Sequence, residues 1–136
     1  NVLINVSSSR MLAAHGFLAR LFSIFEEHKK SVDMLATSEV SVSLTVDDAS
    51  GLDNIEAELS NIAETEIQKN KAIICVVGDA IKSIPGIVGN VFRVLGDNKI
   101  NVEMISQGAS EINISFVVDT KDVEKAVSSL HKEFIG

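Results

Sequence analysis

Two acids, Asp33 and Glu39, stand in the β-rich stretch SVDMLATSEVSVSLTV (residues 31–46), and their surroundings suggest a site for a small zwitterion. A loop ending at Gly16 leads into a helical pattern, whose first backbone N–H groups can bind a carboxylate. We expect Asp33 to lie a few ångströms from this helix start and to offer an acid for an ammonium group. A free amino acid carries both charges. The competing interpretation makes both acids ordinary solvated residues, because a carboxylate buried without a partner is costly.

The chain repeats itself, and the repeat defines the elements that position these residues. A shift of 70 residues places VLINV (2–6) on AIICV (72–76), Gly16 on Gly86, and SVDM (31–34) on NVEM (101–104). After two extra residues in the second copy, SEVSVSLTV (38–46) corresponds to SEINISFVV (110–118). A duplication of this kind indicates one structural unit that is used twice.

Each copy shows the same order of hydrophobic patterns. An apolar, β-branched run (residues 2–6 and 73–77) predicts a first strand. Apolar residues at helical spacing follow and are expected to face the core, namely Phe17, Leu18, Leu21, Phe22 and Phe25 in the first copy and Ile87, Val88, Val91, Phe92 and Leu95 in the second. Two strands come next, and the second alternates apolar residues with Ser41, Ser43 and Thr45 on the other face. An acidic helix follows over 52–63 and 123–134, with Asp or Thr residues before it as expected caps.

This β-α-β-β-α order predicts an α+β fold made of two tandem ferredoxin-like βαββαβ units, each with an antiparallel sheet and its helices on one face. We expect the units to span residues 1–70 and 71–136. The first has a closing strand near residues 66–69. The second reaches Gly136 without one, so we expect that strand to come from residues upstream of Asn1 in a longer protein.

Composition and motifs argue against several classes of function. The net charge of −7 disfavours nucleic acid as a partner, because that binding depends on clustered Lys and Arg. No apolar run is long enough for a membrane span. Cys75 is the only cysteine and is expected in the core, and the three histidines lack metal-ligand spacing. Nucleotide-binding and hydrolase motifs are absent. We therefore expect a cytoplasmic protein with no catalytic residues and no metal site.

The stretches MLAAHGFLARLF, SVDMLATSEVSVSLT and INVEMISQGASEINISFVV closely resemble the tandem ACT regulatory region of aspartate kinases, and the resemblance covers essentially the whole chain. It implies an allosteric region that binds an end-product amino acid, lysine or threonine, at an ACT–ACT interface in a homodimer. Binding would feedback-inhibit the phosphorylation of aspartate by ATP. The resemblance places the kinase domain in cis but outside these residues, together with its ATP and Mg²⁺, and implies no cofactor in the chain itself.

The resemblance also implies the effector site. Asp33 would bind the ammonium group of the ligand, and backbone N–H groups near residues 16–18 would bind its carboxylate. The implied ligand-binding residues are Met11, Ala14, Gly16, Phe17, Leu18, Ser31, Val32, Asp33, Thr37, Ser38 and Glu39. Thr37, Ser38 and Thr45 match positions where feedback resistance arises in relatives. The equivalent places in the second copy, Asn101, Glu103, Ser106 and Gln107, are expected to form a dimer contact.

Two other functions stay open at this point. The chain could be a stand-alone amino-acid-binding ACT protein that controls a different partner, or a dimerisation module without a ligand. The choice between lysine and threonine also stays open, because lysine-sensitive bacterial relatives often have His and Ser where this chain has Ala13 and Ala14.

Overall fold

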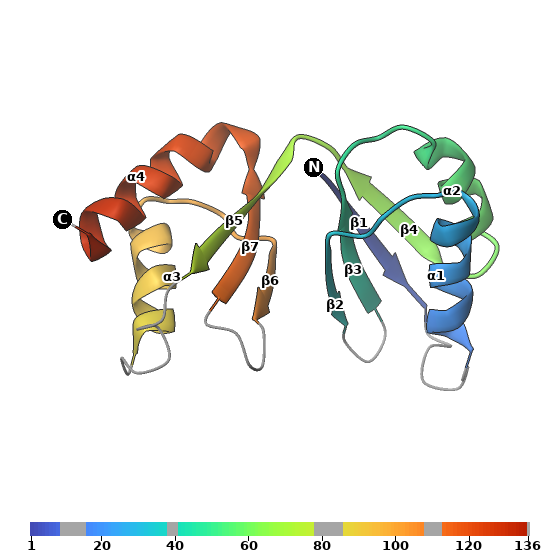
Figure 1. Cartoon of the computed structure of the whole chain (residues 1–136), viewed down its shortest axis with the longest axis horizontal. Helices are drawn as coiled ribbons and strands as arrows, with labels where there is room; N and C mark the ends of the chain where they lie inside the picture. The colour runs from blue at the N-terminus through green and yellow to red at the C-terminus, as the bar shows by residue number, and fades with distance from the viewer. Residues whose placement is uncertain (9–15, 38–40, 78–85, 108–112, 136) are drawn as a thin grey trace. The chain divides into compact units, whose positions relative to one another are not determined.

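The computed structural model describes residues 1–8, 16–37, 41–77, 86–107 and 113–135. The chain forms two compact units, unit 1 over Asn1–Asn70 and unit 2 over Lys71–Gly136. In these described residues, each unit has one antiparallel sheet and two α-helices (Figure 1). Within the described part of the chain, no helix is both long and apolar enough to cross a membrane.

Unit 1 has the predicted ferredoxin-like arrangement. Its elements are β1 (Val2–Ser7), α1 (Phe17–Glu27), β2 (Met34–Thr37), β3 (Ser41–Val46), α2 (Leu52–Leu59) and β4 (Glu64–Gln68). The strand order is β2-β3-β1-β4, and all neighbouring strands are antiparallel. Both helices pack on one face of the sheet, and β2 and β4 are its edge strands (Figure 1).

Unit 2 repeats this order over a smaller sheet. Its elements are β5 (Lys71–Val77), α3 (Ile87–Asp97), β6 (Met104–Gln107), β7 (Asn113–Asp119), a 3₁₀ turn η1 (Thr120–Asp122) and α4 (Val123–Phe134). The strand order is β5-β7-β6 (Figure 1). Among the described residues unit 2 has no counterpart of β4, so β5 is an edge strand there.

Each unit buries its own core between the sheet and the helices. In unit 1, Leu21 and Phe25 of α1 pack against Val42 and Leu44 of β3 and their neighbours. In unit 2, the fully buried Phe116 belongs to a cluster that includes residues of α3 and α4. These contacts confirm that the helical stripes and the alternation in β3 mark the faces that meet in the core.

Burial differs from the prediction at three positions. Leu18 is 41% exposed, because it lies one position round the helix from the buried face of α1. Cys75 is exposed, because Ile74 and Val76 pack on the core and the alternation turns the residue between them to the other face. Thr45, although it alternates with core residues, is fully buried.

The helices that close the two units start without the predicted side-chain caps. Gly51, in a left-handed conformation with φ of 74°, precedes α2, and neither α2 nor α4 has a side-chain cap hydrogen bond. The preceding acids bind lysines instead, Asp48 to Lys30 and Asp119 to Lys71. In both units a long-range ion pair binds the acid before the helix, and Asp48 also accepts a hydrogen bond from the nearby Ser50 N–H at 3.0 Å.

Helix α2 is also shorter than predicted and ends at Leu59 instead of residue 63. The amides of Asn61 and Ile62 donate to carbonyl groups three residues earlier, at Glu58 and Leu59, which tightens the chain into turns. Ile62 still packs against the core, so the apolar pattern continues past the end of the helix.

Candidate functional site

The predicted site residues separate into two groups at opposite ends of unit 1. Thr37 pairs with Val42, at the end of the sheet from which the chain leads to Gly16. Asp33 lies at the other end, where its N–H donates to Thr45 O at 2.8 Å. The 11 residues of α1 run between these ends and rise about 16 Å. The prediction that Gly16 and Asp33 lie a few ångströms apart within one chain is therefore wrong, because α1 carries the chain back to the start of β2 (Figure 1).

The first group lies at the start of α1. Gly16 is the N-cap residue and is exposed, and a Cβ added to it would meet nothing within 4 Å. Phe17 is only 7% exposed and turns into the core, so it can offer a ligand its backbone but little of its side chain. The first N–H groups of a helix have no partner inside it. This end therefore presents N–H donors beside the exposed Leu18.

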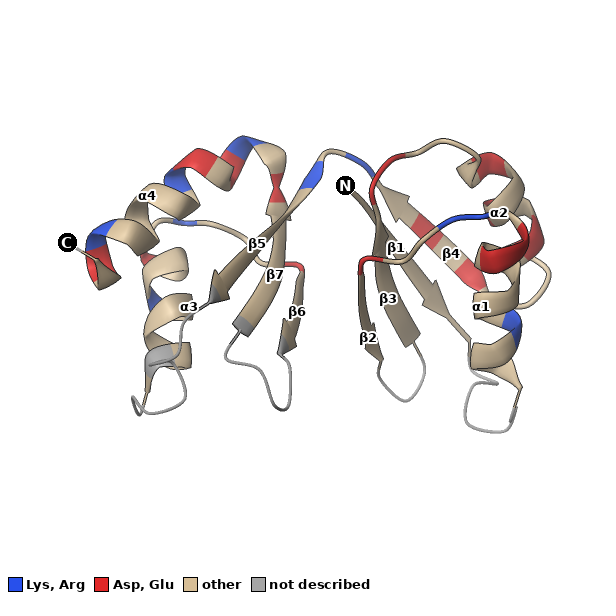
Figure 2. Cartoon of the chain, in the orientation of Figure 1, with Lys and Arg blue, Asp and Glu red and all other residues tan. Residues whose placement is uncertain are grey.

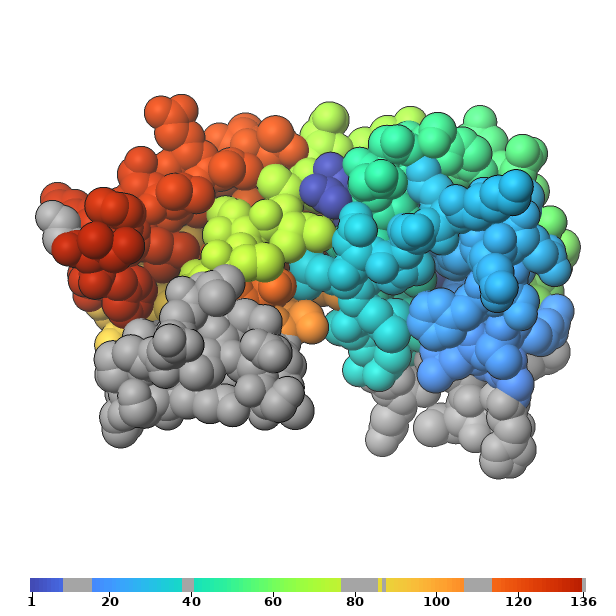
Figure 3. All heavy atoms as spheres, viewed as in Figure 1, coloured from blue at the N-terminus to red at the C-terminus, as the bar shows by residue number. Residues whose placement is uncertain are grey.

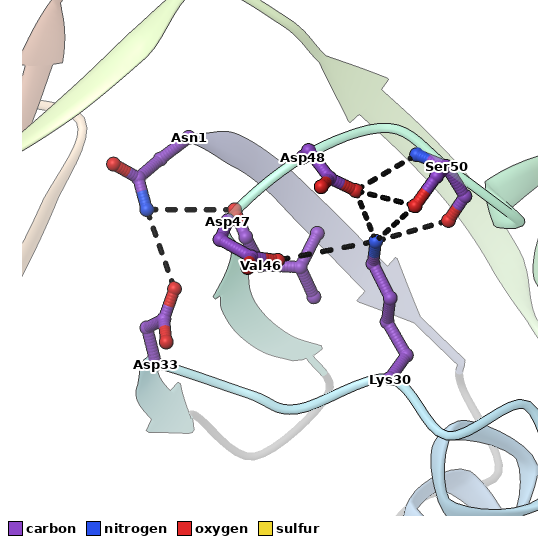
Figure 4. A network of polar contacts seen from close by, with 7 residues as sticks. All are labelled: Asn1, Lys30, Asp33, Val46, Asp47, Asp48 and Ser50. Atoms are coloured by element: carbon purple, nitrogen blue, oxygen red, sulfur yellow. Dashed lines mark hydrogen bonds and ion pairs between the residues drawn. The ribbon is translucent and has the colours of Figure 1, made fainter.

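The second group surrounds Asp33 at the start of β2. Asp33 is exposed and accepts a long hydrogen bond from Asn1 Nδ2 at 3.3 Å (Figure 4). Lys30 turns away from it, with its Nζ 2.6 Å from Asp48 Oδ1 and 2.9 Å from Ser50 O (Figure 4). Within the part of the chain that the structure describes, no Lys or Arg lies within ion-pair distance of Asp33. Its carboxylate is thus available to a cation from outside.

The remaining predicted residues have different surroundings. Ser31 and Thr37 are exposed, whereas Val32 is half-buried and packs on the core. The segment from Ser31 to Thr37 reaches the surface of unit 1 (Figure 3). The other predicted residues lie outside the described residues; they are Met11, Ala14, Ser38 and Glu39.

Thr45 positions the Asp33 end of β2. Its Oγ1 accepts a hydrogen bond from Met34 N–H at 3.0 Å, and its carbonyl accepts the one from Asp33 N–H. One buried residue thus binds two successive amides, those of Asp33 and of Met34, where β2 begins. The sequence gives no sign of this role, because Thr45 alternates with core residues in the same way as the partly exposed Ser41 and Ser43.

The sequence interpretation also missed a buried lysine at the equivalent end of unit 2. Lys71 is only 8% exposed, and its Nζ lies 2.6 Å from Glu103 Oε2 and 2.5 Å from Asp119 Oδ1. Burial acts to lower the pKa of the Lys71 ammonium, but the hydrogen bonds to Asp119 and Glu103 outweigh it, and the pKa lies above its usual value. The repeat could have revealed this lysine, because the 70-residue shift places Lys71 on Asn1 and Glu103 on Asp33.

The ion pairs Lys30–Asp48 and Lys71–Asp119 predict a loss of stability in acid. The hydrogen bond from Lys30 holds the pKa of Asp48 well below its usual value, and Lys71 lowers the pKa of Asp119. A carboxylate of this kind stabilises the fold above its unfolded pKa, near 3.8, and the contribution is lost as the pH falls below that value. We expect the thermal midpoint to fall between about pH 5 and pH 2. The double variant Asp48→Asn, Asp119→Asn should show a shallower fall, and equal slopes would contradict the assignment.

Comparisons with known proteins agree with this architecture. The family model described as ACT domain matches residues 4–57 and 74–134, one segment in each unit. Aspartokinase 1, chloroplastic, of Arabidopsis thaliana is 44% identical over 141 residues, which cover 97% of this chain and 25% of that protein. The chain spans about a quarter of the length of the curated relatives that it matches.

Two solved structures match nearly the whole chain. Escherichia coli aspartokinase III, in complex with lysine and aspartate (T-state), is 35% identical with a TM-score of 0.83, over 99% of this chain and 31% of that one. A candidate C-terminal regulatory domain of aspartate kinase from Porphyromonas gingivalis W83 is 36% identical with a TM-score of 0.83, over 99% of this chain and 92% of that one. The chain therefore belongs to the ACT domain family, as a tandem regulatory region of the aspartate kinase type.

Proposed function

We propose that this chain is the amino-acid sensor of an aspartate kinase, in which lysine or threonine binds unit 1 where two copies meet and feedback-inhibits the kinase. The observation that carries this proposal is the exposed Asp33 carboxylate, which has no Lys or Arg partner among the described residues and stands at a sheet edge. The matching structure of aspartokinase III in complex with lysine supports an amino acid as the ligand.

The length of α1 is the reason for involving a second copy. The N–H donors near Gly16 and the Asp33 carboxylate are one helix length apart, which is too far for one amino acid to bridge. Antiparallel pairing of β2 with the β2 of a second copy would bring the Asp33 end of one strand beside the Thr37 end of the other. The start of α1 lies at that same end, so one chain supplies the donors and the other supplies the acid. Two-fold symmetry then generates two such sites.

The two edges of the unit 1 sheet differ in a way that favours β2 for this pairing. Strand β4 and the neighbouring α2 are rich in acids, including the exposed Glu64 and Glu66, which would repel a second copy (Figure 2). Strand β2 carries no charged residue from Met34 to Thr37. It also exposes the apolar Leu35, 38% of which reaches solvent and would be covered by a partner.

The remainder of the proposed protein follows from its relatives. Because the matched region is about a quarter of their length, we infer that a kinase domain is joined to it in the same chain. That domain would bind ATP and Mg²⁺ and phosphorylate aspartate. We place the protein in the cytoplasm, where a lone thiol such as Cys75 persists in reduced form.

Thermal unfolding of the 136-residue chain tests the proposal. A ligand at 100 times its dissociation constant stabilises the folded state by about 2.7 kcal/mol. We expect lysine or threonine at millimolar concentration to raise the midpoint and the dimer fraction, whereas cadaverine, which has ammonium groups but no carboxylate, should not. If lysine, threonine and methionine all leave the midpoint unchanged, the sensor assignment fails. A dimer that releases no heat with any amino acid would select the ligand-free module.

Removal of the Thr45 hydroxyl should impair binding without harming the fold. Unit 2 carries the buried Val117 at the corresponding position, so valine is compatible with this sheet. Thr45→Val loses the hydrogen bond from Met34 N–H, worth about 0.5–1.5 kcal/mol, and loosens the Asp33 end of β2. We expect the effector dissociation constant, measured by calorimetry, to rise about 3- to 10-fold. Thr45→Ser keeps the hydroxyl and should bind nearly as wild type, and equal affinities in both variants would contradict this role.

A further inference from the structure

The two units place corresponding residues at the start of their second strand. In unit 1, Asp33 N–H donates to Thr45 O at 2.8 Å. In unit 2, Glu103 N–H makes the same bond to Val117 O at 2.9 Å. The strand registers agree as well, so the side chains around these amides can be compared one by one. The corresponding residues are Asn1, Asp33 and Asp47 in unit 1 and Lys71, Glu103 and Asp119 in unit 2.

Unit 2 fills this place with a cation. The Lys71 ammonium lies between the carboxylates of Glu103 and Asp119, at 2.6 Å and 2.5 Å, and the Lys71 side chain is 8% exposed. Glu103 is itself only 21% exposed. Asp119 is more open, at 34% exposed, and both carboxylates bind the one ammonium that the first residue of β5 supplies.

In unit 1, none of the Lys or Arg side chains that the structure describes places its charge on Asp33. Asn1 replaces the lysine, and its neutral amide reaches Asp33 Oδ2 only at 3.3 Å (Figure 4). Asp47 is 75% exposed, and the Lys30 Nζ lies 3.9 Å from it but is held by Asp48 at 2.6 Å. The same backbone hydrogen bond at the start of the second strand is therefore present in both units. Among the described residues, only unit 2 has a lysine bound to the acid at that position.

We propose that this strand start is a cation-binding position common to both units, which unit 2 fills with its own Lys71 and unit 1 keeps for the ammonium group of the effector. For unit 1 the inference rests on the proposed function. For unit 2 the proposal means that free amino acids do not bind at this position. Their ammonium group would have to displace the Lys71 ammonium or lie beside it, where the two positive charges repel each other. The tethered ammonium loses no translational freedom when it binds, so a free competitor is at a disadvantage.

Chemical rescue tests the cation position in unit 2. Lys71→Ala should lower the thermal midpoint of the chain, and n-butylammonium at about 10–50 mM should restore about half of the loss. Butanol at the same concentration carries no charge and should restore none of it. The additional change Glu103→Gln removes one of the two carboxylates and should abolish most of the rescue. If Lys71→Ala does not fold, Lys71→Met removes the charge but keeps the stem packed, and the ammonium ion replaces n-butylammonium in its rescue.

Calorimetry with lysine or threonine tests the exclusion. The wild-type chain should bind one amino acid per chain, and Asp33→Asn should bind it at least about 30-fold more weakly. Lys30→Ala removes another lysine ammonium that is paired with an acid, and it should still bind one amino acid per chain. Wild-type affinity in Asp33→Asn, or a failure of the added ammonium compound to rescue the Lys71 variant, would overturn the inference. Rescue in a chain whose wild type binds no amino acid would refute the proposed sensor function and still establish the cation position in unit 2.

Discussion

Replacing Asp33 with asparagine will weaken effector binding by about 30-fold or more while leaving the fold intact. Loss of one partner from a desolvated, hydrogen-bonded charge pair costs about 2–5 kcal/mol of binding free energy, which sets this scale. The fold should tolerate the change, because Asp33 is exposed and its carboxylate accepts only the long bond from Asn1. Calorimetry with lysine or threonine gives the dissociation constant, and the urea midpoint gives the stability.

A second variant that removes one negative charge shows whether the loss of effector affinity comes from a local contact or from the net charge of the chain. Asp53→Asn removes an exposed acid from the first turn of α2, away from β2, and should leave the dissociation constant unchanged. Equal losses of affinity in both variants would mean that the −7 charge of the chain, not a contact, governs binding. Unchanged affinity in Asp33→Asn would place the ammonium group of the effector elsewhere.

Replacing Phe116 with alanine will destabilise unit 2 by about 3–5 kcal/mol. Phe116 is fully buried, and its ring packs edge-to-face against Phe92 with the centroids 6.0 Å apart. The variant loses this contact and leaves a cavity that neighbouring side chains fill only in part. Because unit 1 has a separate core, its amides should keep their protection in hydrogen exchange, and its affinity for the effector should stay at the wild-type value.

Leu44→Ala is the matched change in the core of unit 1. It should lower stability by about 2–5 kcal/mol and, unlike Phe116→Ala, should also reduce effector binding. Loss of binding in Phe116→Ala while unit 1 remains protected would mean that unit 2 takes part in the effector site. Binding that is unaffected by Leu44→Ala would argue against unit 1 as the sensor.

The sequence predicts the fold well because the fold depends on patterns that are local and repeated. Two patterns predict which side of an element faces the core: the helical stripe that contains Leu21 and Phe25, and the alternation from Val42 to Val46. The 70-residue duplication repeats both. Two copies of the same order confirm one another. Leu18 is exposed although it was predicted to face the core, because the pattern does not distinguish an apolar residue beside the stripe from one within it.

The site is harder to predict because it depends on residues that meet through space. Lys30 and Asp48 are 18 positions apart, and Lys71 and Asp119 are 48 apart, so no local motif signals either pair. The rule that an acid before a helix caps it fails in both units, where a lysine from elsewhere in the chain binds that acid. Gly16 and Asp33 are far apart because α1 runs from one end of the sheet to the other. The spacing of residues along the chain does not predict that direction.

The length of α1 also affects how the response to the effector would depend on protein concentration. A site completed by two chains exists only in the dimer, so the amino acid strengthens dimer formation by the same factor by which the dimer strengthens amino-acid binding. Diluting the protein below its dimer dissociation constant would then lower its sensitivity at a fixed effector level. Such a sensor responds to the abundance of the protein that carries it as well as to the supply of the amino acid.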